Sequence, residues 1–219
     1  MRLRFKTRLL NKEKFYFIAC SGGIDSVAIT HYLVTRFFKE SPFILHVNNH
    51  LFETDKIAAQ NVARLASGLE CTYIEKEHTI YNNDLINLEV VCRQTRLSSY
   101  FECESDVIVC HHLDDAIESY LMNCFNGTPE YLPIPETTKL SKHKGSIYRT
   151  FVPTIIRPFL TTVTKKDLEK YCMKNNLMQY VVEDPLNQKS NRGWLRREVL
   201  PLIKQKYPGI DKVVRKKYL

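Results

Sequence analysis

A glycine-rich turn of six residues, Ser21 to Ser26 (Ser-Gly-Gly-Ile-Asp-Ser), separates an apolar run at residues 15–20 from a helix-forming stretch at residues 27–34. An apolar run that ends at a Gly-Gly pair is typical of a buried strand entering a tight turn. A turn between a strand and a helix directs free backbone N–H groups, and the positive end of the helix dipole, toward one point. The sequence therefore predicts a strand, an anion-binding turn and a helix in succession.

Asp25 is the unexpected residue of this turn, because a carboxylate beside a phosphate is repulsive unless a cation lies between them. Bound Mg²⁺ would supply that cation. A simpler interpretation is that Asp25 or Ser26 caps the helix, but the six-residue context favours a pyrophosphate-binding loop. The turn matches neither the Walker pattern nor the dinucleotide-binding G-x-G-x-x-G pattern. It resembles the PP-loop of ATP pyrophosphatases, which implies that ATP is bound by Ser21, Gly22, Gly23, Ile24, Asp25 and Ser26.

Apolar β-type runs alternate with helix-period stretches over the first half of the chain. Strands are expected at 15–20, 43–47, 71–75 and 106–110, and helices at 27–34, 55–69, 85–100, 113–124, 165–175 and 191–206, the last broken by Pro201. Residues 126–151, with their prolines, glycines and lysines, predict a surface loop. The alternation predicts an α/β fold of Rossmann-like type, a parallel sheet with helices on both faces. We expect a main domain at residues 1–190 and a basic helical segment at residues 191–219.

The net charge of +8 over 219 residues favours a polyanionic partner. Nine Lys and Arg residues lie between Arg192 and Leu219, and we expect this segment to face nucleic acid. No apolar stretch approaches the roughly 20 residues of a membrane span, and the basic start lacks the apolar region of a secretory signal. A cytoplasmic location is expected, with an organelle stroma or matrix as the alternative. The seven cysteines are scattered and form no C-x-x-C pair, which favours core positions over a disulfide framework or a zinc site.

A second polar cluster, residues 111–118, follows the fourth expected strand. Since ligands of open α/β sheets bind beyond the carboxyl ends of the strands, this cluster and the glycine-rich turn are expected at one edge. The adjacent His111 and His112 do not suit a zinc site. Oxygen ligands suit Mg²⁺, so we expect Asp25 and Asp115 to hold that ion beside the phosphates. Glu118, one helical turn beyond Asp115, is then free to hold an ammonium group.

The string His-His-x-Asp-Asp-x-x-Glu-Ser at residues 111–119 resembles the H-H-x-D-D-Q-x-E-T segment of tRNA(Ile)-lysidine synthases. Further segments follow the order of that family over residues 14–205. They are Val47 to Leu51, Arg93 with Arg96, Phe125 to Thr128, Ile156 to Leu160, Glu183 to Asn187, and Arg192 and Arg196 with Leu200-Pro201. The chain resembles a short form of this family that lacks the C-terminal tRNA-binding modules.

This resemblance implies that ATP adenylates the C2 carbonyl oxygen of the wobble cytidine of a tRNA(Ile), and that free lysine displaces AMP. The implied cofactors are ATP and Mg²⁺, the implied partners are tRNA and lysine, and the oligomeric state is left open, a homodimer included. The resemblance assigns catalysis to Asp25, Asp115 and Glu118, further ATP contacts to His46, Asn48 and His112, lysine binding to Arg93, Asp115 and Glu118, and RNA binding to Arg96, Arg157, Arg192, Arg196 and Arg197.

Three other functions fit these residues less well. Cytidine thiolation by a related enzyme would need C-x-x-C cysteines for an iron–sulfur cluster, and the sequence has none. A non-catalytic nucleotide- or RNA-binding protein would not need both the intact turn and the acidic set. An enzyme that carries out an amidation of the GMP-synthetase type would have an attached glutaminase domain, and none is recognised in this sequence. The sequence therefore favours an ATP-dependent ligase that modifies tRNA.

Overall fold

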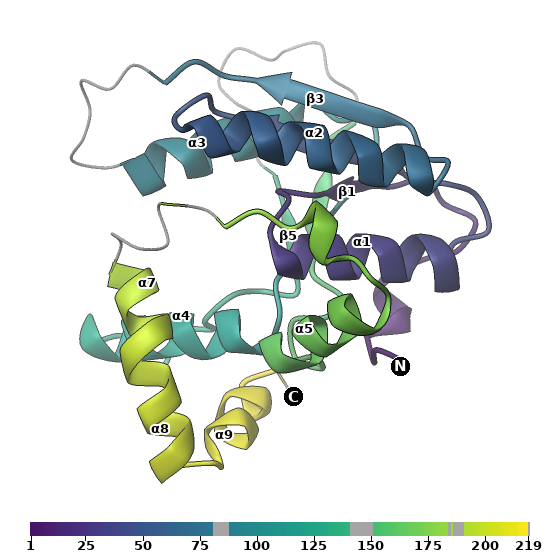
Figure 1. The fold of residues 1–219 in the computed structure, drawn as a ribbon. Coiled ribbons are helices and arrows are strands. Elements are labelled where there is room, and N and C mark those ends of the chain that lie inside the picture. Colours follow the sequence, from purple (N-terminus) through teal and green to yellow (C-terminus); the bar gives the residue numbers. More distant parts are fainter. Residues whose placement is uncertain (81–87, 141–150, 184, 186–190, 219) are drawn as a thin grey trace.

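Six strands form one sheet in the order β3-β2-β1-β4-β6-β5 (Figure 1). The structure, a computed structural model, describes residues 1–80, 88–140, 151–183, 185 and 191–218. β1 lies at the centre of the sheet, parallel to both β2 and β4, with Ile18 opposite Ile44 on one side and Ile108 on the other. The strands are β1 (Phe17–Ala19), β2 (Phe43–Asn48), β3 (Tyr73–Glu77), β4 (Val107–Val109), β5 (Thr137–Lys139) and β6 (Thr154–Ile156).

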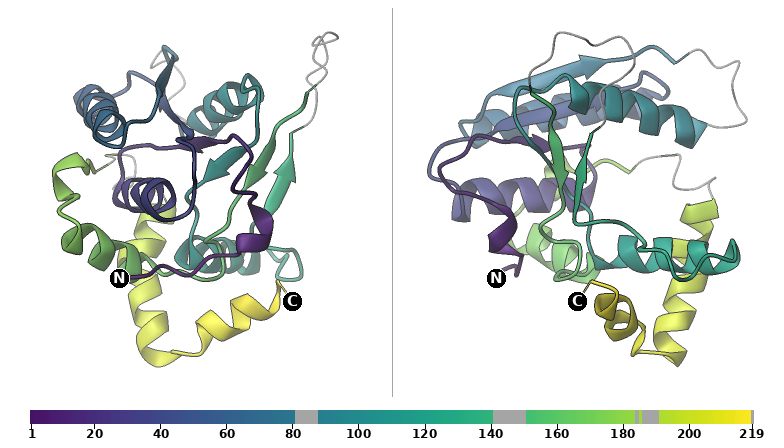
Figure 2. Two further views of the ribbon diagram at one scale, coloured as in Figure 1. Left: turned by 90° about the vertical axis from the view of Figure 1, so that its right-hand side faces the viewer. Right: turned by 180° about the vertical axis from the view of Figure 1, so that it is seen from behind.

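Helices cover both faces of the sheet, as the sequence predicted (Figure 2). Successive strand residues point to opposite faces, so Ile18 contributes to the core under α1, α2 and α5, and its neighbour Phe17 to the core under α3. A third cluster joins α4 to the C-terminal helices. The helices are α1 (Ile24–Arg36), α2 (Glu53–Gly68), α3 (Leu88–Phe101), α4 (Leu113–Phe125), α5 (Lys165–Lys174), α7 (Asn191–Trp194), α8 (Leu200–Lys206) and α9 (Ile210–Lys216), with short 3₁₀ turns at Thr7–Leu9 and Met178–Tyr180.

Two expectations about the second half of the chain were wrong. Residues 126–151 are not loop throughout, because β5 pairs antiparallel with β6 and extends the otherwise parallel sheet. The last helix is not broken at Pro201, because Pro201 lies in the first turn of α8. A π turn at Leu195–Val199 directly precedes it and joins α7 to α8. Pro201 has no backbone N–H, so it cannot donate a hydrogen bond to the turn before it. The wider π turn lies at this point of the helix.

Other elements agree with the sequence to within a few residues. The expected start of the third helix, Leu85, lies outside the described residues, as does part of the expected loop at 141–150. Six of the seven cysteines are buried, in agreement with their expected core positions. Among the described helices, none is both long and apolar enough to cross a membrane.

The C-terminal helices pack onto α4 through Leu195, Leu200 and Val214, all buried. The chain that leads to them passes the glycine-rich turn, where the N–H of Val182 donates to the carbonyl oxygen of Gly22 at 2.9 Å. The C-terminal segment is therefore held to α4, and the chain that precedes it is held to the turn at Val182. The domain boundary at residue 190 stays a prediction.

Gly22 provides a test of how tightly the turn is packed. Its φ is +84°, and a Cβ atom there would lie 3.2 Å from Cβ of Ala58 on α2. Gly127 has a φ of +74° with open space around it. We expect Gly127→Ala to cost about 1 kcal/mol for the left-handed backbone alone, and Gly22→Ala about 2–3 kcal/mol because of the added contact with α2. Urea unfolding measures both, and equal costs would contradict the close approach of the turn to α2.

Candidate active site

The glycine-rich turn joins the end of β1 to the start of α1, with Gly23 as the N-cap of the helix. The hydroxyl of Ser26 donates to the carbonyl oxygen of Gly23 at 2.8 Å and accepts from the N–H of Ser21 at 3.2 Å. These bonds hold the turn closed on itself. The first N–H groups of a helix have no partner within the helix, so the turn and the start of α1 have the arrangement that suits an anion.

Asp25 lies in the first turn of α1 and faces α4 and α5. Its Oδ2 lies 3.3 Å from Nε2 of His112 and 3.6 Å from Nζ of Lys165. Burial alone would raise the pKa of Asp25, but the charges of His112, Lys165 and Arg196 lower it below its usual value. The carboxylate is therefore charged at neutral pH. Its Oδ1 is buried and has no hydrogen-bond partner among the described residues.

His112 lies among three carboxylates at the start of α4. Besides Asp25, its ring nitrogens lie 3.6 Å from Oδ2 of Asp114 and 3.5 Å from Oδ2 of Asp115. Burial lowers its pKa, but the charges of Asp115 and Asp25 outweigh burial and raise the pKa well above the usual value. Neither ring nitrogen has an aligned hydrogen bond among the described residues, so the attraction is between charges. The adjacent His111 is neutral instead, because burial lowers its pKa to about 4.

Glu118 and Asp115 together hold a guanidinium group. Arg196, in the π turn, donates to the two carboxylate oxygens of Glu118 at 2.7 and 2.9 Å and to Oδ1 of Asp115 at 3.2 Å. Glu118 is 2% exposed, and burial raises its pKa even though Arg196 opposes the shift. We predicted that Glu118 is free to hold an ammonium group, that Asp115 is shared between Mg²⁺ and lysine, and that Arg196 contacts RNA. The structure instead brings Arg196 and the two acids together, so the pair binds a cation of the chain itself.

Lys165 is a site residue that the sequence analysis missed. It is the first residue of α5, and its backbone N–H donates to Oδ2 of Asp114 at 2.8 Å while its side chain points to Asp25. Asp114 is also paired with Lys204 of α8. The only sequence signal for Lys165 was its place after the helix-capping Thr164, and nothing local indicates that this helix begins beside α1.

His46 and Asn48, predicted to contact ATP, lie on β2, which neighbours β1. His46 is buried with Nδ1 at 2.9 Å from the carbonyl oxygen of Cys20, and burial lowers its pKa. The amide of Asn48 donates to Glu75 at 2.9 Å. Asn48 and Glu75 also line a hollow of about 360 Å³ beside α2. His46 and Asn48 therefore lie at the same edge of the sheet as the turn, and their role in ATP binding stays a prediction.

The remaining predicted residues are spread more widely. Arg93 and Arg96 are exposed on α3, and Arg192 lies 3.6 Å from Glu89, at the start of that helix. Arg197 is exposed in the π turn. Arg157 differs from the expectation that it contacts RNA, because it is buried and donates to His111, the carbonyl oxygen of Pro135 and the hydroxyl of Thr138. These bonds give Arg157 a structural position under β5, a strand that the sequence did not predict.

Two carboxylates at this edge are candidate ligands for Mg²⁺. Asp25 and Asp115 both lie within 3.5 Å of the same nitrogen of His112, and Asp25 keeps one buried oxygen without a partner. Within the described part of the chain, no group of three or more His, Cys, Asp or Glu side chains is arranged to hold a metal ion. Proteins nevertheless often bind Mg²⁺ through only one or two carboxylates, while phosphate oxygens and water supply the other ligands.

A strand, a glycine-rich turn and a helix N-terminus lie at the centre of a largely parallel sheet. This arrangement is typical of α/β proteins that bind anionic ligands at the carboxyl edge of their strands. The family model described as PP-loop domain matches residues 2–203. The chain belongs to the PP-loop family.

The chain is also similar to individual proteins, by sequence and by structure. The tRNA(Ile)-lysidine synthase of Coxiella burnetii is 27% identical over 97% of this chain and 46% of its own length, and that of Bacillus subtilis is 29% identical over 96% and 45%. The chain thus spans about half the length of the curated relatives it matches. Among solved structures, the U34-tRNA thiolase NcsA from Methanococcus maripaludis has a TM-score of 0.71 at 15% identity, covering 97% of this chain and 75% of that one. That likeness shows the fold.

The opposite pKa shifts of the two adjacent histidines are directly testable. Because the folded-state pKa of His112 lies above the unfolded value of about 6.5, its stabilisation is complete below that pH and is lost as pH rises through the folded-state pKa. Removal of a buried charge partner costs about 3 kcal/mol, so we expect His112→Gln to lower the free energy of unfolding by that amount at pH 6.5, and the loss to shrink toward pH 9.

His111→Gln is the matched control, because His111 is neutral throughout this pH range. Its effect on the free energy of unfolding should be the same at pH 6.5 and at pH 9. Urea unfolding in EDTA buffer measures both variants, and NMR of the imidazole nitrogens measures the pKa values directly. A His112 ring that titrates at or below pH 6.5 would contradict the buried charge cluster.

Proposed function

We propose that this chain carries the catalytic site of an ATP-dependent enzyme that joins free lysine to the wobble cytidine of a tRNA(Ile). The observation that supports this most strongly is the meeting of two binding features at one edge of the sheet. The PP-loop and α1 supply an anion site, and Asp115 with Glu118 supplies a cation site that Arg196 occupies in this structure. An anionic nucleotide and an amine would therefore be held side by side.

In the first step the C2 carbonyl oxygen of cytidine attacks the α-phosphorus of ATP, and the bond to pyrophosphate breaks. The turn and the start of α1 bind the departing pyrophosphate, and Lys165, beside Asp25, adds a positive charge there. Mg²⁺, held by Asp25 and Asp115, would neutralise further phosphate charge. His46 and Asn48 lie on the neighbouring strand, where they would contact the nucleoside part of ATP.

In the second step the lysine amine attacks C2 of the adenylated cytidine, and AMP leaves with the C2 oxygen. The incoming ammonium group must first lose a proton. Glu118 suits that transfer, since burial raises its pKa toward the range of a useful base. Arg93 on α3 is proposed to bind the lysine carboxylate, and Arg96, Arg192 and Arg197 to contact RNA, because all four lie exposed.

The function is tested by incubating the protein with ATP, Mg²⁺, labelled lysine and total tRNA, and digesting the RNA to nucleosides. We expect ATP-dependent label in a modified cytidine. Asp25→Asn should lower the yield at least about 100-fold, because it removes a charged ligand of the Mg²⁺ that would neutralise the departing pyrophosphate. Asp106→Asn is the matched control, since Asp106 is also a largely shielded carboxylate but precedes β4, at the opposite end of that strand, where it accepts a hydrogen bond from Lys14.

Two results would contradict the proposal in different ways. Pyrophosphate release from ATP without transfer of lysine would exclude lysine as the nucleophile and leave the adenylation step. Full activity of Asp25→Asn would exclude its role beside the phosphates.

Glu118→Gln separates the two steps. Loss of one charged hydrogen bond to the ammonium group costs about 2 kcal/mol, so the KM for lysine should rise about 30-fold. The rate of lysine transfer should also fall, because glutamine cannot accept the proton, while pyrophosphate formation changes little. Glu198→Gln changes an exposed glutamate of the π turn, which accepts a hydrogen bond from the indole N–H of Trp194, and should leave both steps unchanged. Equal losses of adenylation and lysine transfer in Glu118→Gln would contradict a lysine site at this residue.

A further inference from the structure

The two ends of the described chain carry its whole excess of positive charge. Residues 1–14 hold six Lys and Arg against one acid, Glu13, and residues 204–219 also hold six against one, Asp211. Together they carry +10, so the 189 residues between them carry −2 of the net +8. Such a division of charge is much more uneven than the overall composition suggests, and it concentrates any attraction for a polyanion at the two ends.

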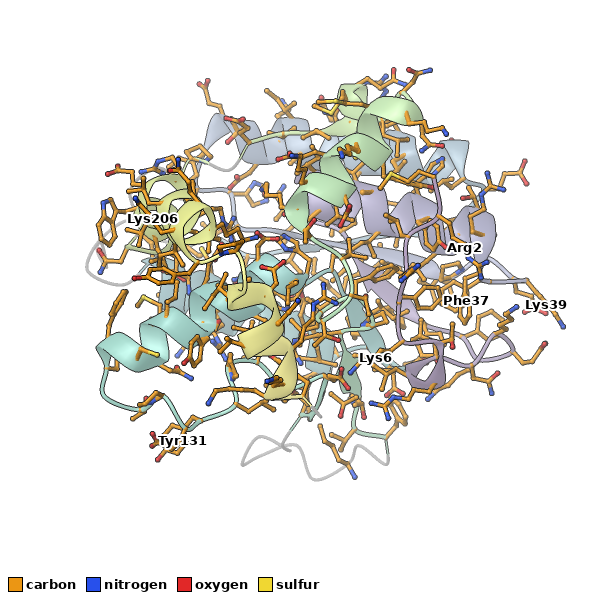
Figure 3. All side chains as sticks on the ribbon, turned by 90° about the horizontal axis from the view of Figure 1, so that it is seen from below. Arg2, Lys6, Phe37, Lys39, Tyr131 and Lys206 are labelled. Carbon is orange, nitrogen blue, oxygen red and sulfur yellow. The ribbon has the colours of Figure 1, made fainter. Side chains whose placement is uncertain are left out.

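The fold brings these two basic segments to the same face of the molecule. Seen from below, α9 lies between Lys206 and Lys6, and Arg2 lies further along the same face (Figure 3). Tyr218, just after α9, lines a cavity of about 490 Å³ with Phe5, Lys6, Thr7 and Arg8. The Tyr218 hydroxyl accepts from the N–H of Ile134 at 3.3 Å, and Lys6 and Arg8 pair with nearby Glu136. The segment from Ile134 to Glu136 therefore contacts both the N-terminal segment and Tyr218 after α9.

Apolar anchors turn the charges of both segments outward. In the N-terminal segment Leu3 is buried in the main core, and the flanking Arg2 and Arg4 are exposed. In α9, Val214 is buried against α4, and Lys212 and Lys216 are exposed. Within the described part of the chain, these four cations make no ion pair. Their charges are held in place by the fold and left for a partner.

Positive charge also gathers beside the N-terminal segment from other elements. Lys174, at the end of α5, and Arg36, at the end of α1, lower the pKa of the Met1 ammonium group. This shift reflects like charges held close together. A surface of this kind gains most from a ligand that carries several negative charges at once.

Exposed aromatic rings accompany the basic residues. Tyr207 is 71% exposed and directly follows Lys206, and Trp194 is 47% exposed in α7, on the same helical run. Proteins that bind single-stranded or looped RNA combine cationic side chains for phosphates with such rings for stacking on bases. These rings favour RNA over a simple inorganic anion.

We propose that the N-terminal segment and α9 form a single docking surface for the phosphate backbone of RNA, with Arg4 and Lys216 as central contacts. The surface extends along α8 toward the candidate active site, since Lys204 on α8 pairs with Asp114 there. The identification of this RNA as tRNA rests on the proposed function. The C-terminal segment was already expected to face nucleic acid; the structure adds the first 14 residues to the same surface.

The test compares single charge reversals on and off the surface, using the whole 219-residue chain. Arg4→Glu and Lys216→Glu each should weaken binding of a fluorescent, unmodified tRNA(Ile) transcript about tenfold at low salt. Arg64→Glu is the matched control, because Arg64 is exposed on α2, at the far end of the molecule from α9 (Figure 1). Arg4→Gln and Lys216→Gln should each reduce the slope of log K against log salt by about 1.

Arg4→Glu binding tRNA as tightly as Arg64→Glu would overturn the proposal. So would unchanged tRNA binding by both surface variants together with loss of binding to phosphatidylglycerol–phosphatidylcholine vesicles, which would assign the face to a membrane. Thermal unfolding confirms that each variant is folded. At saturating tRNA the surface variants should keep their rate of lysine incorporation and show a higher KM for tRNA. Absence of incorporation by the unaltered protein would refute the proposed function, and the binding results would still decide the surface.

Discussion

The structure depends on a charge balance at the carboxyl edge of the sheet. Four acids, Asp25, Asp114, Asp115 and Glu118, lie among four cations, His112, Lys165, Arg196 and Lys204. Taking a charge out of water costs several kcal/mol unless a well-placed partner offsets it. Because the partners come from α4, α5, the π turn and α8, satisfying the acids requires all these elements to meet. The site chemistry and the docking of the C-terminal helices are thus parts of one interaction.

This balance also shapes what a ligand must do to bind. The cation site of Glu118 and Asp115 holds Arg196 through three hydrogen bonds. An ammonium group that enters it replaces a charged partner, so its net affinity is the difference between two similar interactions. A ligand that also brought negative charge to the freed Arg196 would offset part of that loss. A nucleotide in the neighbouring anion site would bring such charge, and amine binding would then be favoured once a phosphate ligand is present.

The elements that could be predicted from the sequence are those whose signals are local. The turn at residues 21–26 and the acids after β4 are each coded within a few residues, and the parallel order of the strands brings their ends together. Lys165 and Arg196 could not be placed, because they reach the site from 140 and 171 positions beyond Asp25. β5 was not predicted, because its three residues, Thr-Thr-Lys, form an edge strand with no apolar alternation. The burial of Arg157 could not be predicted for the same reason, since it depends on β5 and the segment before it.

The helical run from α7 through α8 connects the two regions that this fold separates. It carries Arg196 at the acidic site, Lys204 beside Asp114, and Lys206 on the basic face. A helix rises 1.5 Å per residue, so the ten residues from Arg196 to Lys206 span only about 15 Å. Within the described residues the run is anchored by apolar contacts of Leu195 and Leu200 with α4. A π turn at the acidic end widens the helix where Arg196 leaves it. The same helical run therefore carries both Lys206 on the basic face and the guanidinium of Arg196. A partner that binds at one end affects the other end only if it favours one position of this run over another.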